Sequence, residues 1–228
     1  MSVQKVMQLI KEKNIEWVDF RFVGLSGKAQ HISLPASELE EETFTNGVAF
    51  DGSSIPGFRG IEQSDMVMLP VPETAYVDPF TAHPTLIIMC DIYTPDGERY
   101  DRDPRGIAQK AEEYLRSTGI GTEAYFGPES EFFIFDDVRF ASNMNGTFYE
   151  VDSVEGVWNT GRKEEGGNLG FKVPVKGGYV PVQPVDTQQD IRSEMCNLMM
   201  AAGLRIDRHH HEVATAGQGE INFRFDTL

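Results

Sequence analysis

The chain has 228 residues, and 36 Asp and Glu against 20 Lys and Arg give it a formal net charge of -16. Such an acidic chain repels a phosphate backbone, and nucleic acid is therefore not expected as a partner. Hydrophobic residues make up 40% of the chain, enough for a folded core. No stretch reaches the roughly 18 apolar residues of a membrane span, and Cys90 and Cys196 form no CxxC pair. We therefore expect a cytoplasmic protein with reduced thiols and no membrane partner.

The first hundred residues predict a small α+β domain. Ser2 can cap a helix whose apolar residues recur at helical spacing. Residues 15–35 alternate in polarity on both sides of a turn at residues 25–28, which predicts a β-hairpin. Further strands are expected over residues 64–69 and 85–93, in an antiparallel or mixed sheet.

A second domain is expected to begin at residue 104, which gives domains over residues 1–103 and 104–228. At this boundary Asp103 can cap a helix, Pro104 suits its first turn and Gly119 can end it. The new helix therefore predicts the start of a new folding unit.

Strand and loop signals alternate through the rest of the chain. Residues 123–137 are strand-like, whereas residues 156–178 are rich in Gly and predict long loops. A helix is expected between Asp186-Thr187 and Gly203. The final residues, FRFDTL, stop in the middle of a strand pattern, so we expect the chain to be a fragment of a longer protein.

Four glutamates are the strongest candidates for chemistry: Glu129, Glu131, Glu212 and Glu220. Residues two apart on a strand share a face, so the first two project into one space, and the last two can face each other across a hairpin. An isolated E-x-E is more often a pair of solvated charges, but the aromatic flanks predict a buried strand. Buried carboxylates need a cation, and Mg²⁺ and Mn²⁺ prefer carboxylate oxygen. The pattern therefore predicts a divalent-metal site.

The three histidines at 209–211 are weaker candidates. His209 and His211 would share a strand face, which leaves a zinc site as an alternative. No HExxH motif occurs, and strand histidines are more often hydrogen-bonded than metal-bound, so we expect them to orient a carboxylate or a substrate. No GxxxxGK[ST] or GxGxxG loop is present, and the run around Asp51 predicts only a turn.

Several long motifs resemble those of one known family. The run FDGSSIPGFRGIEQSDMVM resembles the N-terminal signature of type I glutamine synthetase, and later runs resemble blocks of its catalytic half: FGPESEFFIFDDVRF, KGGYVPVQPVD, QDIRSEMC and HHHEVATAGQGE. The stretch containing EGGNLGFK resembles the longer bacterial form. The resemblance runs from about residue 3 to Leu228 and covers the N-terminal half of the family's length. It implies an α+β fold, with a small β-grasp-like N-terminal domain and the first part of a catalytic domain built on a curved antiparallel sheet.

The resemblance also implies a reaction. Members of this family join ammonia to L-glutamate with ATP, through a γ-glutamyl phosphate intermediate, in ammonia assimilation. Two divalent ions, Mg²⁺ or Mn²⁺, are needed to draw the anionic substrates together. The implied assembly is a dodecamer of two hexameric rings, with each active site built between neighbouring subunits.

Individual site residues follow from the same resemblance. Glu131, Glu212 and Glu220 would bind one metal ion, and Glu129 would bind the other beside ATP. Asp51, entering from the neighbouring subunit, resembles the residue that takes a proton from ammonium. Ser54, Tyr179 and Glu212 would complete the ammonium pocket.

For the nucleotide, Phe225 resembles the aromatic residue that stacks on adenine, with Tyr125 and Gly127 close by. Asp207 stands where relatives usually carry Glu. The other ligands of the ATP-side metal lie beyond Leu228 in the family, so the isolated chain is expected to be inactive.

Two alternatives stay open at this stage. One is a family relative that joins glutamate to an amine larger than ammonia, and the other is a non-catalytic metal-binding or structural relative. Asp51, Ser54 and Tyr179 favour ammonia, because a pocket made for NH₄⁺ gains from small polar groups.

Overall fold

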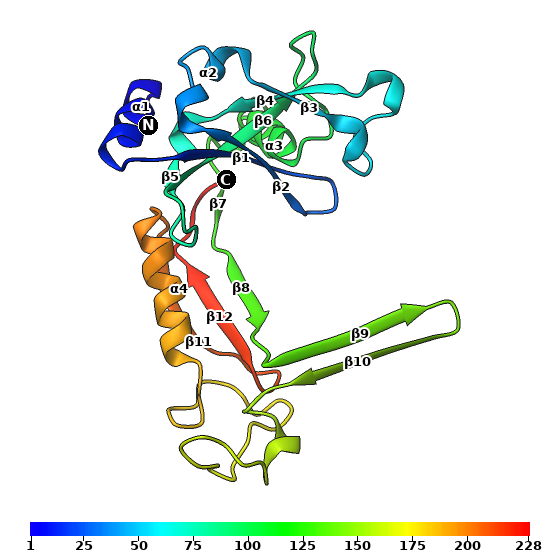
Figure 1. Ribbon diagram of the computed structural model, residues 1–228, viewed down its shortest axis with the longest axis vertical. Coiled ribbons are helices and arrows are strands. Elements are labelled where there is room, and N and C mark those ends of the chain that lie inside the picture. The colour runs from blue at the N-terminus through cyan, green and yellow to red at the C-terminus, as the bar shows by residue number, and fades with distance from the viewer. The chain divides into compact units, whose positions relative to one another are not determined.

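The computed structural model describes residues 1–228, and the chain divides into two compact units. The first unit is Met1–Ala124 with Leu228, and the second is Tyr125–Thr227 (Figure 1). Helix α3 (Pro104–Thr118) groups with the first unit. The expected domain boundary at residue 104 therefore stays a prediction. No helix in either unit combines the length and the apolar composition that a membrane span needs.

The first unit begins with a helix and a hairpin, as predicted. Helix α1 (Val3–Glu12) is capped by Ser2, whose hydroxyl accepts a hydrogen bond from the backbone N–H of Lys5 at 3.4 Å. Strands β1 (Trp17–Val23) and β2 (Ala29–Pro35) then pair antiparallel.

The sheet of the first unit is mixed, and its strand order is β2-β1-β6-β4-β3, with β5 also paired to β6. Strands β1 and β6 run parallel, whereas the other pairs are antiparallel (Figure 1). The remaining strands are β3 (Val48–Asp51), β4 (Asp65–Pro70), β5 (Tyr76–Val77) and β6 (Thr85–Tyr93). The short helices are α2 (Thr43–Asn46), η1 (Ala36–Glu38), η2 (Gly52–Ser54), η3 (Ile61–Gln63) and η4 (Pro72–Thr74).

An apolar core holds this unit together. It is formed by buried side chains of helix α1, the sheet and the loops around them: Val6, Val18, Phe20, Phe22, Met66, Met68, Leu86, Ile88, Cys90, Ile92 and Tyr100. Helix α3 begins and ends where predicted. The carboxylate of Asp103 accepts a hydrogen bond from the N–H of Arg105 at 3.1 Å, and Gly119 ends the helix with a left-handed φ of 70°.

The second unit contains a three-stranded antiparallel sheet of order β11-β12-β8. Its strands are β8 (Glu129–Phe133), β11 (Ile206–His211) and β12 (Gln218–Phe223), and helix α4 (Gln189–Ala201) lies along the sheet (Figure 1). A separate two-stranded antiparallel sheet is formed by β7 (Tyr125–Phe126) and β13 (Asp226–Thr227). The predicted helix is confirmed, and so is a hairpin in the segment from Glu212 to Glu220. Its turn was expected at Gly217-Gln218-Gly219, but Gln218 and Gly219 belong to β12 and the turn lies at residues 212–217.

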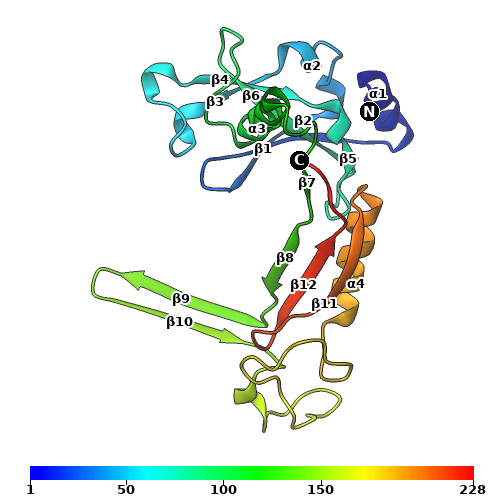
Figure 2. The ribbon, with the colours of Figure 1, turned by 180° about the vertical axis from the view of Figure 1, so that it is seen from behind.

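One hairpin was not predicted from the sequence. Strands β9 (Asp137–Asn143) and β10 (Gly146–Asp152) form a long antiparallel pair that projects from the end of the three-stranded sheet (Figure 2). The signal was available, because Asn145-Gly146 lies between two runs rich in strand-forming residues.

Residues 153–188 are largely irregular, as the Gly-rich composition predicted, with one short helix, η5 (Val157–Asn159). The expectation of a buried strand around Glu129 and Glu131 was wrong. Strand β8 is an edge strand that pairs only with β12, and both glutamates are exposed. Aromatic flanks identified a strand, but they could not say whether another element covers its face.

Candidate active site

The register of β8 against β12 gathers the predicted carboxylates. Glu220 lies opposite Glu131, and Asn222 lies opposite Glu129. Because side chains alternate along a strand, these four side chains share one face of the sheet. On the other side of β12, His210 of β11 lies opposite Glu220.

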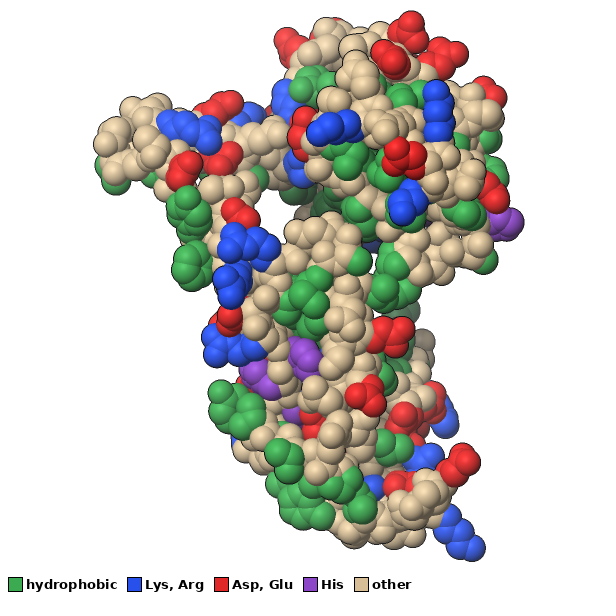
Figure 3. All heavy atoms as spheres, turned by 90° about the vertical axis from the view of Figure 1, so that its left-hand side faces the viewer, with side chains coloured by type: hydrophobic (Ala, Val, Ile, Leu, Met, Phe, Trp, Pro, Cys, Tyr) green, Lys and Arg blue, Asp and Glu red, His purple; other side chains and the backbone are tan.

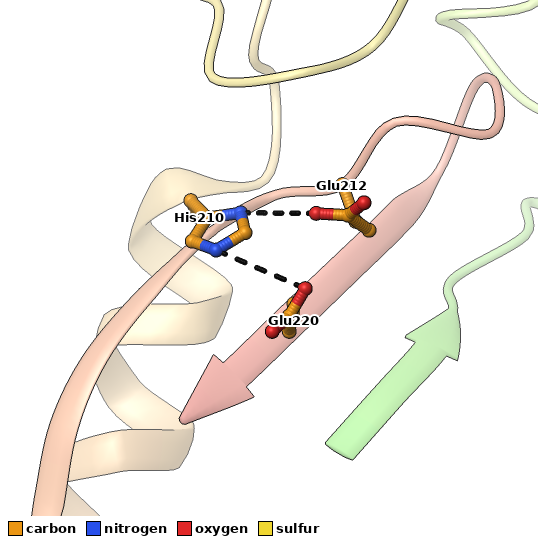
Figure 4. A group of neighbouring side chains, drawn as sticks. All are labelled: His210, Glu212 and Glu220. Carbon is orange, nitrogen blue, oxygen red and sulfur yellow. Dashed lines mark ion pairs between the residues drawn. The ribbon is translucent and has the colours of Figure 1, made fainter. Parts of the chain in front are cut away.

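A tight group forms where β11 ends. One ligand atom from each of His210, Glu212 and Glu220 lies within 4.8 Å of the others (Figure 4). His210 Nδ1 is 3.4 Å from a Glu212 oxygen, and its Nε2 is 3.8 Å from a Glu220 oxygen. Burial raises the pKa of Glu220, and the neighbouring Glu212 carboxylate raises it further. Two carboxylates and an imidazole that crowd one point fit a divalent cation, which would relieve their repulsion.

Two amide side chains on β12 flank Glu220 and hold the carboxylates of β8. Gln218 Nε2 donates to Glu131 at 2.8 Å. Asn222 Nδ2 donates to Glu129 at 3.2 Å and to Glu220 at 2.7 Å, so it links two of the predicted metal ligands. The Oδ1 atom of Asn222 is buried and has no hydrogen-bond partner. Pre-positioned carboxylates with an unpaired carbonyl beside them are consistent with a site arranged for a ligand.

The three histidines do not converge on one point. His209 accepts a hydrogen bond from Arg192 Nε at 3.4 Å and lies 3.2 Å from the hydroxyl of Ser193, both on α4. Burial, and then the Arg192 charge, lower the pKa of His209. His211 instead contacts Glu155. The alternative of a zinc site made by these histidines therefore has no geometric support, whereas His210 lies close enough to the carboxylates to be a ligand itself.

His211 and Glu155 form a buried ion pair, and both side chains are 0% exposed. Burial alone would lower the pKa of His211, but the hydrogen bond and the charge of Glu155, together with the carbonyl oxygens of Glu212 and Gly178, raise it. Burial would instead raise the pKa of Glu155, yet the hydrogen bonds from His211, Thr187 and Gly217 lower it to about 2. Each partner therefore favours the charged form of the other.

Tyr179, whose place in an ammonium pocket stays a prediction, lies beside His210 of this group. Its ring meets the His210 ring edge-on, with centroids 5.6 Å apart and planes at 83°. The preceding residue, Gly178, approaches the hairpin closely, because a Cβ there would lie 2.6 Å from the carbonyl oxygen of Glu212. Only glycine fits this crossing without displacing its neighbours.

Asp51 and Ser54 belong to the first unit and form a compact turn. One Asp51 oxygen accepts from the N–H of Ser53 at 2.9 Å and from its hydroxyl at 2.6 Å, and the other accepts from the Ser54 hydroxyl at 2.6 Å. These bonds, above all the one from the Ser53 hydroxyl, lower the pKa of Asp51. Asp51 is thus a fixed, exposed carboxylate, able to attract a cation.

A pocket of about 510 Å³ lies at the other end of β12. It is lined by Gly127, Glu129, Arg205, Asp207, Arg208, Asn222, Phe223, Arg224 and Phe225. A β-bulge between Ile206 and Arg208 makes Asp207 the extra residue, and Asp207 pairs with Arg208 Nε at 2.8 Å. The pocket gathers three of the predicted nucleotide residues, Gly127, Asp207 and Phe225, with three arginines. Tyr125 is not part of its lining but pairs with Thr227 beside it.

Sequence reasoning missed four residues of this region. Gln218 and Asn222 had a usable signal, since they stand two residues before and after Glu220 and so share its face. Glu155 had none, because its partners lie 32 to 62 positions away in the chain. Arg192 pairs with Asp186, six positions before it, but the local pattern does not show that this ion pair is buried.

Comparison with known proteins matches the whole chain to one family. Residues 14–95 match the family model "Glutamine synthetase, beta-Grasp domain", and residues 101–228 match "Glutamine synthetase, catalytic domain". The chain is 56% identical to a glutamine synthetase of Vibrio cholerae and 53% identical to one of Escherichia coli K12, over 229 residues each. These alignments cover 100% of this chain and 49% of each relative, so the chain spans about half the length of the curated relatives it matches.

Solved structures agree. A cryo-EM structure of Plasmodium falciparum glutamine synthetase superposes with a TM-score of 0.87 at 29% identity and covers 100% of this chain and 45% of its own. A structure of a protein named GmaS, at 20% identity and a TM-score of 0.69, covers 97% of this chain and 45% of its own, and shares the fold. The predicted α+β fold with a β-grasp domain is confirmed, and the chain belongs to the glutamine synthetase family.

Proposed function

We propose that this chain supplies part of the active site of an ATP-dependent ligase that joins ammonia to L-glutamate in the cytoplasm. The glutamate side-chain carboxylate attacks the γ-phosphorus of ATP, so that ADP leaves and γ-glutamyl phosphate forms. Ammonia then attacks the acyl carbon, the bond to the phosphate oxygen breaks, and glutamine and phosphate result. The observation that carries the proposal is the shared carboxylate face of β8 and β12 in a chain of this family.

The carboxylates are proposed to hold two Mg²⁺ or Mn²⁺ ions. Glu131, Glu212 and Glu220 would bind one ion, and Glu129 would contribute to the other. His210 lies near enough to join the first set. When bound, such ions neutralise charge on the phosphates and on the carboxylate. The part played by Gln218 is to keep Glu131 oriented, through the 2.8 Å hydrogen bond.

Ammonium is proposed to bind between Asp51, Ser54, Tyr179 and Glu212. The lowered pKa of Asp51 keeps it ionised, so it attracts NH₄⁺. The same carboxylate is proposed to take the proton that ammonium loses as its nitrogen becomes the nucleophile. We propose that Asp51 reaches the site from a neighbouring subunit, in a dodecamer of two hexameric rings. Each active site would then combine the first unit of one chain with the second unit of another.

The pocket beside β12 is the proposed nucleotide site. Phe225 would stack on adenine, with Gly127 and Tyr125 close by and Asp207 on the rim. Its three arginines supply the positive charge that a polyphosphate needs in an otherwise acidic chain. Because Asp207 is already paired with Arg208, it adds no uncompensated negative charge there.

The test is phosphate release from ATP by the protein produced from its complete gene. We expect release to require glutamate and ammonium together, and Glu131→Gln to abolish it. Glu150→Gln, an exposed residue of β10, is the matched control and should leave release unchanged. Faster release with methylamine than with ammonium would instead support a ligase for larger amines. Binding of Mn²⁺ without any turnover would support a non-catalytic metal-binding relative.

A further inference from the structure

A buried carboxylate outside the proposed substrate contacts joins three separate parts of the second unit. Glu155 follows β10 and accepts four hydrogen bonds. Thr187 donates its N–H and its hydroxyl to Oε1, both at 2.8 Å. Gly217 donates its N–H to Oε2 at 2.7 Å, and His211 Nε2 lies 2.9 Å from the same oxygen. A carboxylate with 0% side-chain exposure is stable only when all its acceptor sites are used in this way.

His211 carries the connection further. Its Nδ1 lies 2.7 Å from the carbonyl oxygen of Gly178 and 2.9 Å from that of Glu212. Carboxylate and carbonyl oxygens can only accept, so the ring donates from both nitrogens. Glu155 is therefore coupled through one imidazole to the backbone on either side of the candidate site, at Gly178 before Tyr179 and at Glu212.

The backbone segments that meet around His211 are packed too closely to move independently. A Cβ at Gly178 would lie 2.8 Å from the His211 ring, and one at Gly217 would lie 2.5 Å from the carbonyl oxygen of Ile134. These segments are in close contact, so a shift of the His211 ring moves the backbone that carries Tyr179 and Glu212.

We propose that Glu155 is a positioning residue, which through His211 fixes the backbone of Gly178–Tyr179 and of Glu212 and thereby keeps the metal and ammonium groups facing each other. The role in catalysis rests on the proposed function, whereas the coupling itself does not. Glu155 touches no proposed substrate and acts only through His211, Gly217 and Thr187.

Glu155→Gln is the sharpest variant because it keeps the size of the side chain. A glutamine places an NH₂ group toward either Thr187 or His211, where it meets another donor. Asp19→Asn is the matched control. Asp19 is a buried carboxylate of the first unit that contacts His31 Nδ1 at 2.6 Å and accepts from Ser33 at 2.7 Å.

The first measurement is amide hydrogen exchange of the chain, resolved by residue. In Glu155→Gln we expect exchange to become about tenfold faster at residues 178–180, 211–213 and 217 together, because a charged hydrogen bond is lost. Asp19→Asn should leave these segments unchanged. Faster exchange confined to the start of α4, near Thr187, would overturn the proposal, since Glu155 would then serve only that helix.

The second measurement is Mn²⁺ binding followed by electron paramagnetic resonance. Loss of a group that orients a metal ligand weakens binding by about tenfold or more. Because Glu155 holds the backbone of Glu212 through His211, we expect this loss in Glu155→Gln but not in Asp19→Asn. Unchanged Mn²⁺ affinity despite faster exchange would overturn the positioning role.

Two further outcomes are decided by the same experiments. If the unchanged chain binds no Mn²⁺, the proposed metal site fails, while hydrogen exchange still decides whether Glu155 couples the three segments. If Glu155→Gln does not fold, Glu155→Asp retains the charge with one methylene fewer. It should give intermediate exchange at 178–180 and 211–213, and exchange equal to that of the unchanged chain there would overturn the proposal.

Discussion

The two units of the chain differ in what fills their interiors. The first unit buries a continuous apolar cluster from α1, β1, β4 and β6. In the second unit the buried apolar side chains are Val173, Cys196, Ala216 and Ile221, and most other buried residues are polar: Ser153, Glu155, Asn159, Asp186, Gln188, Arg192, His211, Glu212, Gln218, Glu220 and Asn222. The first unit is therefore stabilised by removing apolar surface from water, and the second by pairing polar groups around the candidate site.

Apolar side chains of the second unit are instead found on its surface. Figure 3 shows green hydrophobic side chains next to purple histidines on one face of this unit. Among the exposed residues are Phe126, Phe133, Phe140, Phe148, Tyr149, Leu169 and Phe171. Exposed apolar groups in such number are typical of surfaces that other protein chains cover, which agrees with the proposed subunit assembly.

Each unit carries one tryptophan, so the two interiors can be followed separately. Trp17 lies on β1 and Trp158 on η5, and the chain has no other. In Trp158→Phe only Trp17 remains, and its fluorescence follows the first unit. In Trp17→Phe only Trp158 remains, and its fluorescence follows the second unit.

Removing a large apolar side chain should affect only the first unit. Phe20 is 0% exposed in the middle of its core. We expect Phe20→Ala to lower the free energy of unfolding by about 3–5 kcal/mol, because it leaves a cavity. In urea unfolding, Phe20→Ala should shift the transition that Trp17 reports and leave the transition that Trp158 reports unchanged. An equal shift of both transitions would show that the two interiors unfold as one.

Breaking a buried ion pair should affect the second unit instead. Arg192 of α4 is 0% exposed and forms a bidentate ion pair with the carboxylate of Asp186. Arg192→Met leaves that carboxylate buried without its partner, which typically costs about 3–5 kcal/mol. We expect the Trp158 transition to show this loss of stability. The double variant Arg192→Met with Asp186→Leu should recover part of the lost stability. If the single variant is as stable as the unchanged chain, the polar interior does not hold this unit together.

Acid should weaken the polar interior through Glu155. Its pKa of about 2 in the folded chain lies below the ordinary value of 4.5. A depressed carboxyl pKa contributes stability that is complete above the ordinary value and is lost as pH falls toward the folded one. We expect the Trp158 transition to lose about 2 kcal/mol from this group by pH 3. In Glu155→Gln the same transition should be less stable at pH 6 and should lose less between pH 6 and pH 3. A parallel decline in both proteins would contradict this assignment.

Local sequence patterns predicted the first unit better than the second. Ser2, Asp103 and Gly119 mark helix ends by chemistry within one turn, and the structure has each helix end there. In the second unit, residue spacing placed Glu129 with Glu131, and the hairpin placed Glu212 near Glu220. Spacing along one strand is a local property that the sequence displays directly.

Contacts between distant segments could not be predicted in this way. Glu155 meets His211 across 56 positions of the chain, and nothing around Glu155 distinguishes it from a surface glutamate. The exposure of β8 has the same origin, because burial depends on which element covers a strand rather than on the strand's own residues. The roles of Asp51, Tyr179 and the metal ligands came from family resemblance, and they stay proposals.

The smallest expected effect concerns the two amides that flank Glu220. Asn222→Ala removes the group that links Glu129 to Glu220, and Gln218→Ala removes the partner of Glu131. Outer partners of metal ligands typically contribute about tenfold to affinity, so we expect Mn²⁺ binding to weaken by about that factor in each variant. Asn222→Ala also removes the buried, unpaired Oδ1 atom, whose burial opposes folding.

The two amides therefore differ in their expected effect on stability. The Trp158 transition should change less in Asn222→Ala than in Gln218→Ala. The side-chain carbonyl of Gln218 accepts a hydrogen bond from the N–H of Ala214 at 2.7 Å, and Gln218→Ala loses that bond. Binding of Mn²⁺ and urea unfolding, measured on the same preparations, separate the two contributions. Weaker binding in both variants, with a stability loss only in Gln218→Ala, would show that the polar interior holds the ligands in place as well as the fold. Unchanged binding in both would mean that the carboxylates of β8 need no such support.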